Sequence, residues 1–302
     1  MTHTPTVSVI LTCFNGERYI AKAIQSVLDQ TWRDFELIVV DDGSTDGTSA
    51  VVRAIPDPRL RYVRKENSGP GAARNTGIEA ATGEWVAFLD CDDWWLATKL
   101  ERQMDTARAA RADFVCSGAT LVTGDGGRMG DVPARIGEGA LEMLLLGNHV
   151  PGGGSSALVR RSAINSVAGF DETVPLAEDW DCWLRLAARF PMASTPTCEV
   201  CKLVRPGSYG LQTDRLLGSG TMILDRAFTS YARHLGHLRR PALAALHYLA
   251  ALDYNQIGNR AAERRALWAL LGYRPFSLEI HRRLLRTFLP RGRARTAGAS
   301  PR

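Results

Sequence analysis

The chain has 302 residues, of which 45% are hydrophobic and 23% charged, and this balance excludes wholesale disorder. The formal net charge is +5, but seven arginines and no acid lie in residues 282–302, so residues 1–281 carry a formal charge of −2. A general nucleic-acid-binding surface is therefore disfavoured. No stretch reaches the roughly 18 apolar residues of a spanning helix, and the N-terminal apolar run is too short for a leader. We expect a cytoplasmic protein.

Predicted strands and helices alternate along the first ninety or so residues. Four compact apolar runs are typical of buried strands: Val7–Cys13, 35–40, 60–63 and 85–89. Helices are predicted between them, over 19–28, over 45–54 and from a glycine-rich turn at 69–71 through Ala81. This alternation predicts an α/β fold with a mostly parallel sheet, in which ligands bind at the carboxyl ends of the strands.

The pattern loosens after residue 112 and becomes helical near Asp214. We expect strands over 113–122 and 153–159, a glycine-rich loop over 123–139 and a helix over 178–190. A helical hairpin is predicted over 242–256 and 261–271. The predicted organisation is a catalytic domain (1–212), a helical extension (213–290) and a basic tail (291–302).

Acidic clusters follow two of the predicted strands. Asp41 and Asp42 end the second strand, where an Asp helix cap and a functional pair are equally plausible. Asp90, Asp92 and Asp93 end the fourth strand, and three carboxylates this close repel one another unless a cation compensates. Oxygen ligands of this kind suit Mg²⁺ or Mn²⁺ bridging substrate phosphates.

A third acidic group, Glu178 and Asp179, begins the predicted helix over 178–190. Taken alone, favourable interaction with the helix dipole explains it better than a general base. Arg74 lies in the glycine-rich turn region, where phosphate binding and a salt bridge to a neighbouring acid are equally plausible. That segment fails the dinucleotide-binding fingerprint, and no P-loop motif occurs. Cys198 and Cys201 lack the second ligand pair of a zinc site.

Five segments, in this order along the chain, resemble the motifs of family-2 glycosyltransferases of the GT-A fold. They are VSVILTCFN (7–15), VVDDGSTD (39–46), NSGPGAARNTG (67–77), FLDCDD (88–93) and EDW (178–180). The resemblance covers about residues 5–210. Each segment alone is a modest signal, whereas five in order are highly specific.

The resemblance implies a nucleotide-sugar site. It places in the nucleotide pocket the residues Thr12, Phe14, Asn15, Asp41 (on the base), Asp42, Arg74 and Asp90. Asp92 would bind the Mg²⁺ or Mn²⁺ ion that bridges the diphosphate. A late loop with Arg205 and Ser208, together with Glu178, would contact the diphosphate or the acceptor. Cys201 and Lys202 stand where the family often has Tyr-Arg, which weakens the assignment of that loop.

The resemblance also makes Asp179 the catalytic base and implies a single displacement that inverts the anomeric carbon. The donor would be a nucleoside-diphosphate sugar, with UDP favoured by family habit. The acceptor would be a saccharide or lipid-linked saccharide of cell-envelope polysaccharide or glycolipid synthesis.

Two rival functions and one surface remain open. A sugar-nucleotide nucleotidyltransferase would carry a basic glycine-rich loop after the first strand, which residues 13–16 (CFNG) do not provide. A non-catalytic carbohydrate- or protein-binding module is the other rival, although all three expected acidic positions are intact. Near the C-terminus, residues 280–289 predict a basic amphipathic helix. It would either lie on anionic lipid, making the protein peripheral at the inner membrane face, or pack onto the domain.

Overall fold

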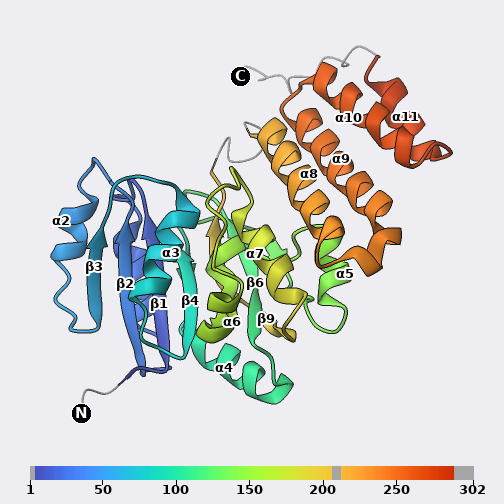
Figure 1. Cartoon of the computed structure of the whole chain (residues 1–302). Helices are drawn as coiled ribbons and strands as arrows, with labels where there is room; N and C mark the ends of the chain where they lie inside the picture. The colour runs from blue at the N-terminus through green and yellow to red at the C-terminus, as the bar shows by residue number, and fades with distance from the viewer. Residues whose placement is uncertain (1–3, 206–211, 289–302) are drawn as a thin grey trace, which may run out of the picture.

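A single mixed sheet organises the α/β part of the chain (Figure 1). The computed structural model describes residues 4–205 and 212–288, and within these ranges nine strands pair in the order β3-β2-β1-β4-β8-β6-β9-β5, with β7 beside β6. The strands are β1 (Val7–Cys13), β2 (Phe35–Asp41), β3 (Leu60–Arg64), β4 (Trp85–Asp90), β5 (Trp94–Trp95), β6 (Phe114–Val122), β7 (Arg128–Val132), β8 (Ala157–Arg160) and β9 (Met192–Leu203).

Helices cover both faces of this sheet and continue beyond it. They are α1 (Ile20–Leu28), α2 (Thr48–Arg53), α3 (Pro70–Ala80), α4 (Lys99–Ala110), α5 (Ala140–Leu145), α6 (Arg161–Ser166), α7 (Glu178–Ala187), α8 (Thr213–Thr229), α9 (Arg239–Gln256), α10 (Arg260–Tyr273) and α11 (Leu278–Arg286). Two 3-10 turns, η1 (Gly153–Ser156) and η2 (Arg233–Leu238), precede β8 and α9.

Parallel pairing joins β1 to β2 and β4, and β2 to β3, as the alternation of elements predicts. The second half of the sheet is mixed, because β8 runs antiparallel to both β4 and β6. Its direction follows from η1, where the Ser155 hydroxyl accepts a hydrogen bond from the Asp90 N–H at the end of β4. The chain therefore enters β8 at the carboxyl edge and must run backward. The predicted α/β fold is confirmed, but the sheet is mixed: β1 to β4 pair in parallel, and in the second half only β6 and β9 do so among the described strands.

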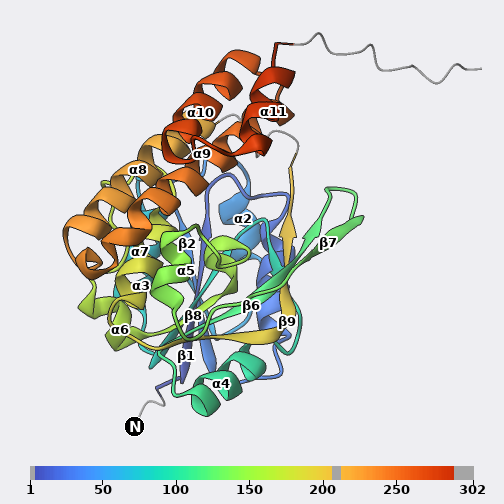
Figure 2. The same ribbon diagram turned by 90° about the vertical axis from the view of Figure 1, so that its right-hand side faces the viewer.

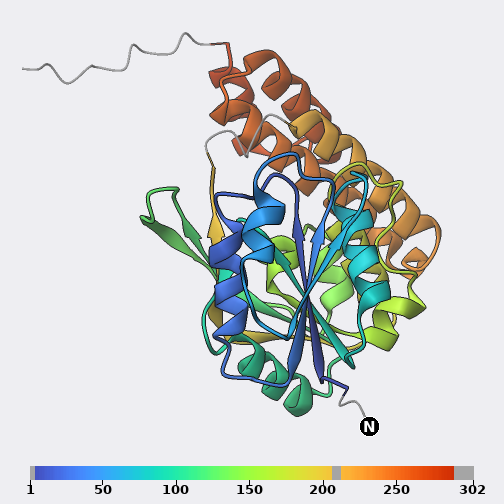
Figure 3. The ribbon, with the colours of Figure 1, turned by 90° about the vertical axis from the view of Figure 1, so that its left-hand side faces the viewer.

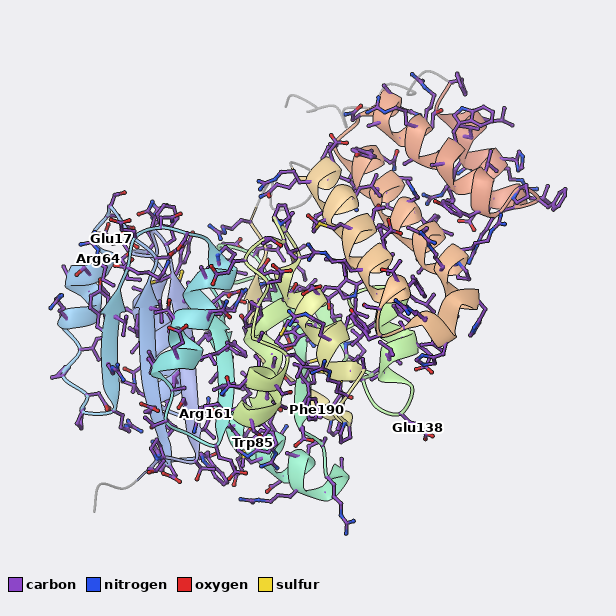
Figure 4. All side chains as sticks on the ribbon, viewed as in Figure 1. Glu17, Arg64, Trp85, Glu138, Arg161 and Phe190 are labelled. Atoms are coloured by element: carbon purple, nitrogen blue, oxygen red, sulfur yellow. The ribbon has the colours of Figure 1, made fainter. Side chains whose placement is uncertain are left out.

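Alternating strand residues belong to two hydrophobic layers, one on each side of the sheet. Figure 3 shows the helices on both sides of the sheet. Val9 and Leu11 of β1 pack with α1 and α4, whereas Ile10 between them packs with α3 and α7. This alternation follows from the two-residue period of a strand whose faces are both covered. Figure 4 shows Glu17 and Arg64 at the edge where the parallel strands end, and Trp85 at the opposite edge.

The C-terminal helices lie beyond β6 and β9, on the side toward which the parallel strands point (Figure 1). Helix α8 joins the core of the α/β layer through Ile223 and Leu224. Helices α9 to α11 share a separate small core that includes Leu267 and Ile280. The domain boundary at residues 212 and 213 stays a prediction, and residues 291–302 lie outside the described ranges.

Two local predictions were wrong. The predicted loop over 123–139 contains β7, which forms a projecting hairpin with β6 (Figure 2). Its turn is closed by the Thr123 N–H donating to the Gly127 carbonyl, so the glycines mark a hairpin turn. The predicted strand over 153–159 begins only at Ala157, because η1 occupies its first four residues.

Candidate active site

A cleft of about 620 Å³ opens at the carboxyl ends of β1 and β4. Its wall includes six of the predicted site residues, namely Thr12, Phe14, Asp42, Asp90, Asp92 and Arg205. The phenyl ring of Phe14 is 51% exposed there. Arg205 and Arg215, which also lines the cleft, bring positive charge to it. Strand ends that are distant in sequence thus create one ligand-sized hollow, with acids and arginines in its wall, at the expected edge of the sheet.

Asn15 and Asp41 lie beside this cleft but are not among its lining residues. The Asp41 side chain is fully buried, and its carboxylate accepts hydrogen bonds from the Ser44 N–H at 2.8 Å and from the Tyr62 hydroxyl. The Asn15 side-chain oxygen accepts from the Thr45 N–H at 2.8 Å. Both side chains shape the turn after β2, and their predicted roles toward the nucleotide stay predictions.

Asp42 anchors the loop that leads into α3. One carboxylate oxygen accepts from the Ser68 N–H at 3.0 Å and the other from the Gly69 N–H at 2.8 Å, while the Lys65 ammonium lies 3.0 Å from the first. Three donors satisfy a carboxylate that is only 4% exposed. The loop backbone that borders the cleft is therefore held in one place.

Arg74 connects the end of β4 with the start of α7. Its guanidinium donates to Asp90 at 2.9 Å and to Glu178 at 2.5 Å. Burial would raise the pKa of Asp90, but the charges of Arg74 and Lys202 outweigh it and lower that pKa below its usual range. Of the two interpretations of Arg74, the structure favours the salt bridge, because the residue is 5% exposed and lies outside the cleft lining.

Asp92 faces the cleft and forms an ion pair with Arg205, whose side chain is 56% exposed. The guanidinium of Arg205 also lies 5.9 Å from the centre of the Tyr19 ring. The other predicted member of the late loop, Ser208, lies outside the described residues.

Asp93 is turned away from the cleft into the protein. Its carboxylate accepts from the Ser155 hydroxyl at 2.6 Å and the Leu203 N–H at 3.1 Å, and lies 3.0 Å from the Lys202 ammonium. Burial raises the pKa of Asp93 to about 6, although Lys202 opposes the shift. The third acid of the cluster therefore ties β9 to η1.

Asp179 is the second residue of α7 and is partly buried beside the loop that precedes η1. Its carboxylate accepts hydrogen bonds from the Asn148 amide at 3.3 Å and from the Trp180 N–H at 2.7 Å. Burial and the neighbouring Glu178 raise its pKa to about 6, against the opposing charge of Arg74. A carboxylate with such a pKa suits proton transfer near neutral pH.

Residues 8–167 match the sequence profile of glycosyl transferase family 2. The succinoglycan biosynthesis protein ExoO of Rhizobium meliloti (strain 1021) is 35% identical over 254 residues, which cover 80% of this chain and 70% of that protein. The chain belongs to glycosyltransferase family 2. The putative teichuronic acid biosynthesis glycosyltransferase TuaG of Bacillus subtilis (strain 168) is 42% identical over 125 residues, or 40% of this chain and 50% of TuaG.

Solved structures confirm the GT-A fold of this glycosyltransferase. S. aureus TarS 1-349, crystallised in complex with UDP-GlcNAc, superposes with a TM-score of 0.64 over 89% of this chain and 81% of its own, at 19% identity. The mannosyltransferase PcManGT from Pyrobaculum calidifontis, in complex with GDP-Man and Mn²⁺, gives 0.59 over 95% and 85% at 20% identity. At these identities the likeness establishes the fold of the glycosyltransferase.

One carboxylate in the cleft wall of this glycosyltransferase is a candidate ligand for a divalent cation. No group of three His, Cys, Asp or Glu side chains among the described residues could hold a metal ion unaided. Mg²⁺ and Mn²⁺ are commonly held by one or two carboxylates together with substrate phosphates and water. Asp92, at the cleft wall, is a carboxylate of that kind.

Three residues of the glycosyltransferase site were not predicted from the sequence, namely Lys202, Asn148 and Arg215. Lys202 lies 3.0 Å from Asp93 and 3.9 Å from Asp90, which keeps its pKa above the usual value. Its position depends on the pairing of β9 with β6, for which no short-range signal exists. Asn148 and Arg215 come from a loop and from the first turn of α8, whose positions only the tertiary fold determines.

Proposed function

We propose that this glycosyltransferase transfers a sugar from a nucleoside-diphosphate sugar, with UDP favoured, to an acceptor hydroxyl with inversion. The observation that carries the proposal is the Arg74 bridge, which joins Asp90 at the cleft to the helix that presents Asp179. A donor-binding acid and a candidate base are thereby held in one rigid assembly. Such preorganisation is what an in-line displacement requires.

In the proposed reaction, Asp179 accepts the proton of an acceptor hydroxyl as the hydroxyl oxygen attacks the anomeric carbon. The bond to the diphosphate breaks on the opposite side, so a single displacement inverts the centre. Thr12, Phe14 and Asp42 border the nucleotide, with Asn15 and Asp41 supporting the adjoining turn. Arg205 and Arg215 offset the charge that develops on the departing diphosphate. A Mg²⁺ or Mn²⁺ ion at Asp92 would add Lewis-acid stabilisation of that charge.

Binding of UDP, GDP, dTDP and ADP, each with and without Mn²⁺, tests the donor site by calorimetry. One diphosphate should bind in a metal-dependent way, and Asp92→Asn should weaken that binding at least about tenfold. Asp105→Asn, an exposed acid on α4, is the matched control and should leave it unchanged. Metal-independent binding would remove the cation from the proposal, and binding of no diphosphate to folded protein would remove the transferase site.

Release of nucleoside diphosphate during turnover separates this proposal from a nucleotidyltransferase, which would release pyrophosphate. The anomeric configuration of the product, read by NMR, tests the displacement. Asp179→Asn should abolish transfer, and near-normal transfer by that variant would exclude Asp179 as the base. A product of retained configuration would exclude the single displacement.

For the cellular role, we propose synthesis of cell-surface polysaccharide or glycolipid on a saccharide or lipid-linked acceptor. ExoO and TuaG are named for succinoglycan and teichuronic acid biosynthesis, and both support this class of product. Within the described residues, no helix has the length and apolarity required to cross a membrane.

Peripheral contact with an anionic membrane surface is also proposed, through α11. The apolar positions of the predicted amphipathic helix are Ile280, Leu284, Leu285, Phe288 and Leu289. Ile280 and Leu284 pack inward against α10, and Leu289 lies outside the described residues. Leu285 on α11 and Phe288 just after the end of this helix are 67% and 63% exposed, and Arg282 and Arg286 lie on α11. Exposed apolar side chains among arginines suit an anionic interface.

Sedimentation with vesicles tests this contact. Wild type should sediment with vesicles containing phosphatidylglycerol and remain free with phosphatidylcholine alone, whereas Leu285→Glu/Phe288→Glu should lose binding. Met129→Glu on β7, at a residue that is 57% exposed, is the control. Two results would contradict the membrane contact. One is equal sedimentation of the wild type with both vesicle types, and the other is sedimentation of the double variant with anionic vesicles to the wild-type extent.

A further inference from the structure

A second cavity, distinct from the cleft, begins at Asp179 and runs between α7, α8 and α9. Its volume is about 570 Å³, and its lining includes five leucines: Leu146, Leu216, Leu217, Leu246 and Leu249. Its polar lining includes Asp179, its hydrogen-bond partner Asn148, and Lys202. The cavity is thus predominantly apolar, with the candidate base in its wall.

Close helix packing builds the walls of this cavity. A Cβ atom added at Gly220 of α8 would lie 2.8 Å from the Leu246 side chain and 3.2 Å from Trp180. A side chain at this position would require the Leu246 side chain to shift, so α8 packs closely against α7 and α9 here. The Trp180 indole is fixed as well, because it donates to the Leu144 carbonyl at 2.7 Å. The cavity is therefore a preformed feature of the fold.

The cavity and the cleft meet through one ion pair. Lys202 lines the cavity, Asp90 lines the cleft, and the ammonium lies 3.9 Å from the Asp90 carboxylate. A group in the cleft and a group in the cavity would therefore approach each other across the Lys202–Asp90 pair, next to Asp179. In the proposed reaction the donor occupies the cleft, so the cavity is left to the acceptor.

We infer that this cavity binds an aliphatic chain carried by the acceptor, with the reacting hydroxyl held at Asp179 and the chain among the leucines. The inference rests on the proposed function. A free saccharide offers hydroxyls and no apolar surface, and would leave the leucine walls facing water. An alkyl or isoprenoid chain matches those walls, and a chain can leave the cavity where Leu249 and Leu216 are 53% and 38% exposed.

Calorimetric binding of octyl glucoside, kept below its micelle concentration, and of methyl glucoside tests the inference on the full chain. Each buried methylene contributes about 0.8 kcal/mol, so burying two already gives about a tenfold difference. Octyl glucoside should therefore bind at least about tenfold more tightly than methyl glucoside. Leu216→Glu/Leu249→Glu should remove this preference, and both sites are exposed enough for the variant to fold.

Ile257→Glu is the matched control, because Ile257 caps the same helix as Leu249, is 47% exposed and lies outside the cavity lining. It should keep the preference for the octyl chain. Equal binding of the two glucosides, or an unchanged preference in the double variant, would overturn the inference. If wild type is an oligomer without a preference for the octyl chain, and the double variant is a monomer, the cavity is a subunit interface. This result would also overturn the inference.

Nucleotide binding, measured on the same samples, separates this inference from the proposed function. If a diphosphate binds and the chain length of the glucoside has no effect, the inference is overturned and the transferase proposal stands. If wild type binds no diphosphate but prefers the octyl chain, and the double variant loses this preference, the transferase proposal is overturned. The bound chain could then no longer be assigned to an acceptor.

Discussion

Transfer by this protein is predicted to slow between pH 7 and pH 5, because Asp179 must be ionised to accept a proton. Burial, reinforced by Glu178 and opposed by Arg74, raises its pKa from 3.8 to about 6. A carboxylate of that pKa is about nine-tenths ionised at pH 7 and about one-tenth ionised at pH 5. The value of kcat/KM should therefore fall about tenfold. With an ordinary pKa the carboxylate would stay about nine-tenths ionised at pH 5.

The assay is the initial rate of nucleoside diphosphate release from pH 5 to 8, with circular dichroism at each pH to verify folding. Glu178→Gln tests the direction in which the pKa of Asp179 shifts. Removing this negative neighbour also leaves Arg74 with one carboxylate fewer, and both changes lower the pKa of Asp179. The acid limb should then move to lower pH, whereas Glu142→Gln, an exposed change on α5, should leave it in place.

A rate that stays level between pH 5 and pH 7 in folded wild type would refute the assignment of the base. An acid limb that does not move in Glu178→Gln would refute the electrostatic reasoning while leaving the base in place. The wild-type profile thus tests the role of Asp179 as the base, and the Glu178→Gln profile tests the cause of its raised pKa.

Two further predictions concern stability, measured by urea unfolding. Arg74→Met leaves Asp90 and Glu178 without their shared partner and should lower the free energy of unfolding by about 3–5 kcal/mol. A loss below about 1 kcal/mol would show that the bridge does not stabilise the fold. Arg74→Lys should recover only part of the lost stability, because one ammonium cannot reproduce the two-sided guanidinium contact. Gly77→Ala would place a methyl group 2.2 Å from the Ile10 side chain, where α3 crosses β1, and should cost about 1–3 kcal/mol. The control is Gly218→Ala on α8, which meets nothing within 4 Å and should stabilise by up to about 1 kcal/mol; equal effects at the two glycines would contradict the close-packing argument.

Much of the cleft was predictable because its signals are local. A compact apolar strand that ends in acids places those acids at the carboxyl edge of a parallel sheet, and Asp42, Asp90 and Asp92 all reach one cleft there. The first strand, Val7–Cys13, has the predicted bounds. Short-range patterns were enough here, since strand, turn and helix follow within about thirty residues of one another.

Other parts depend on long-range packing that no local pattern reveals. Strand β9 pairs with β6 through register shifts, and this pairing brings Lys202 to Asp90 and Asp93. Likewise, the amphipathic pattern of α11 identifies a helix, but only its packing decides that Ile280 faces inward and Leu285 outward. The cavity between α7, α8 and α9 belongs to the same class, because its walls come from separate helices.

Arg74 shows how one buried cation leaves two nearby carboxylates with opposite pKa shifts. Its two contacts go to Asp90 and to Glu178, while Asp179 accepts from the uncharged Asn148 amide and a backbone N–H instead. At Asp90 burial would raise the pKa, but Arg74 and Lys202 outweigh it and lower the pKa; at Asp179 burial and Glu178 raise the pKa against the more distant charge of Arg74. Neighbouring acids whose pKa values shift in opposite directions can take different roles in catalysis. A permanently charged Asp90 suits the donor side, and a titrating Asp179 suits the side where a proton must be accepted.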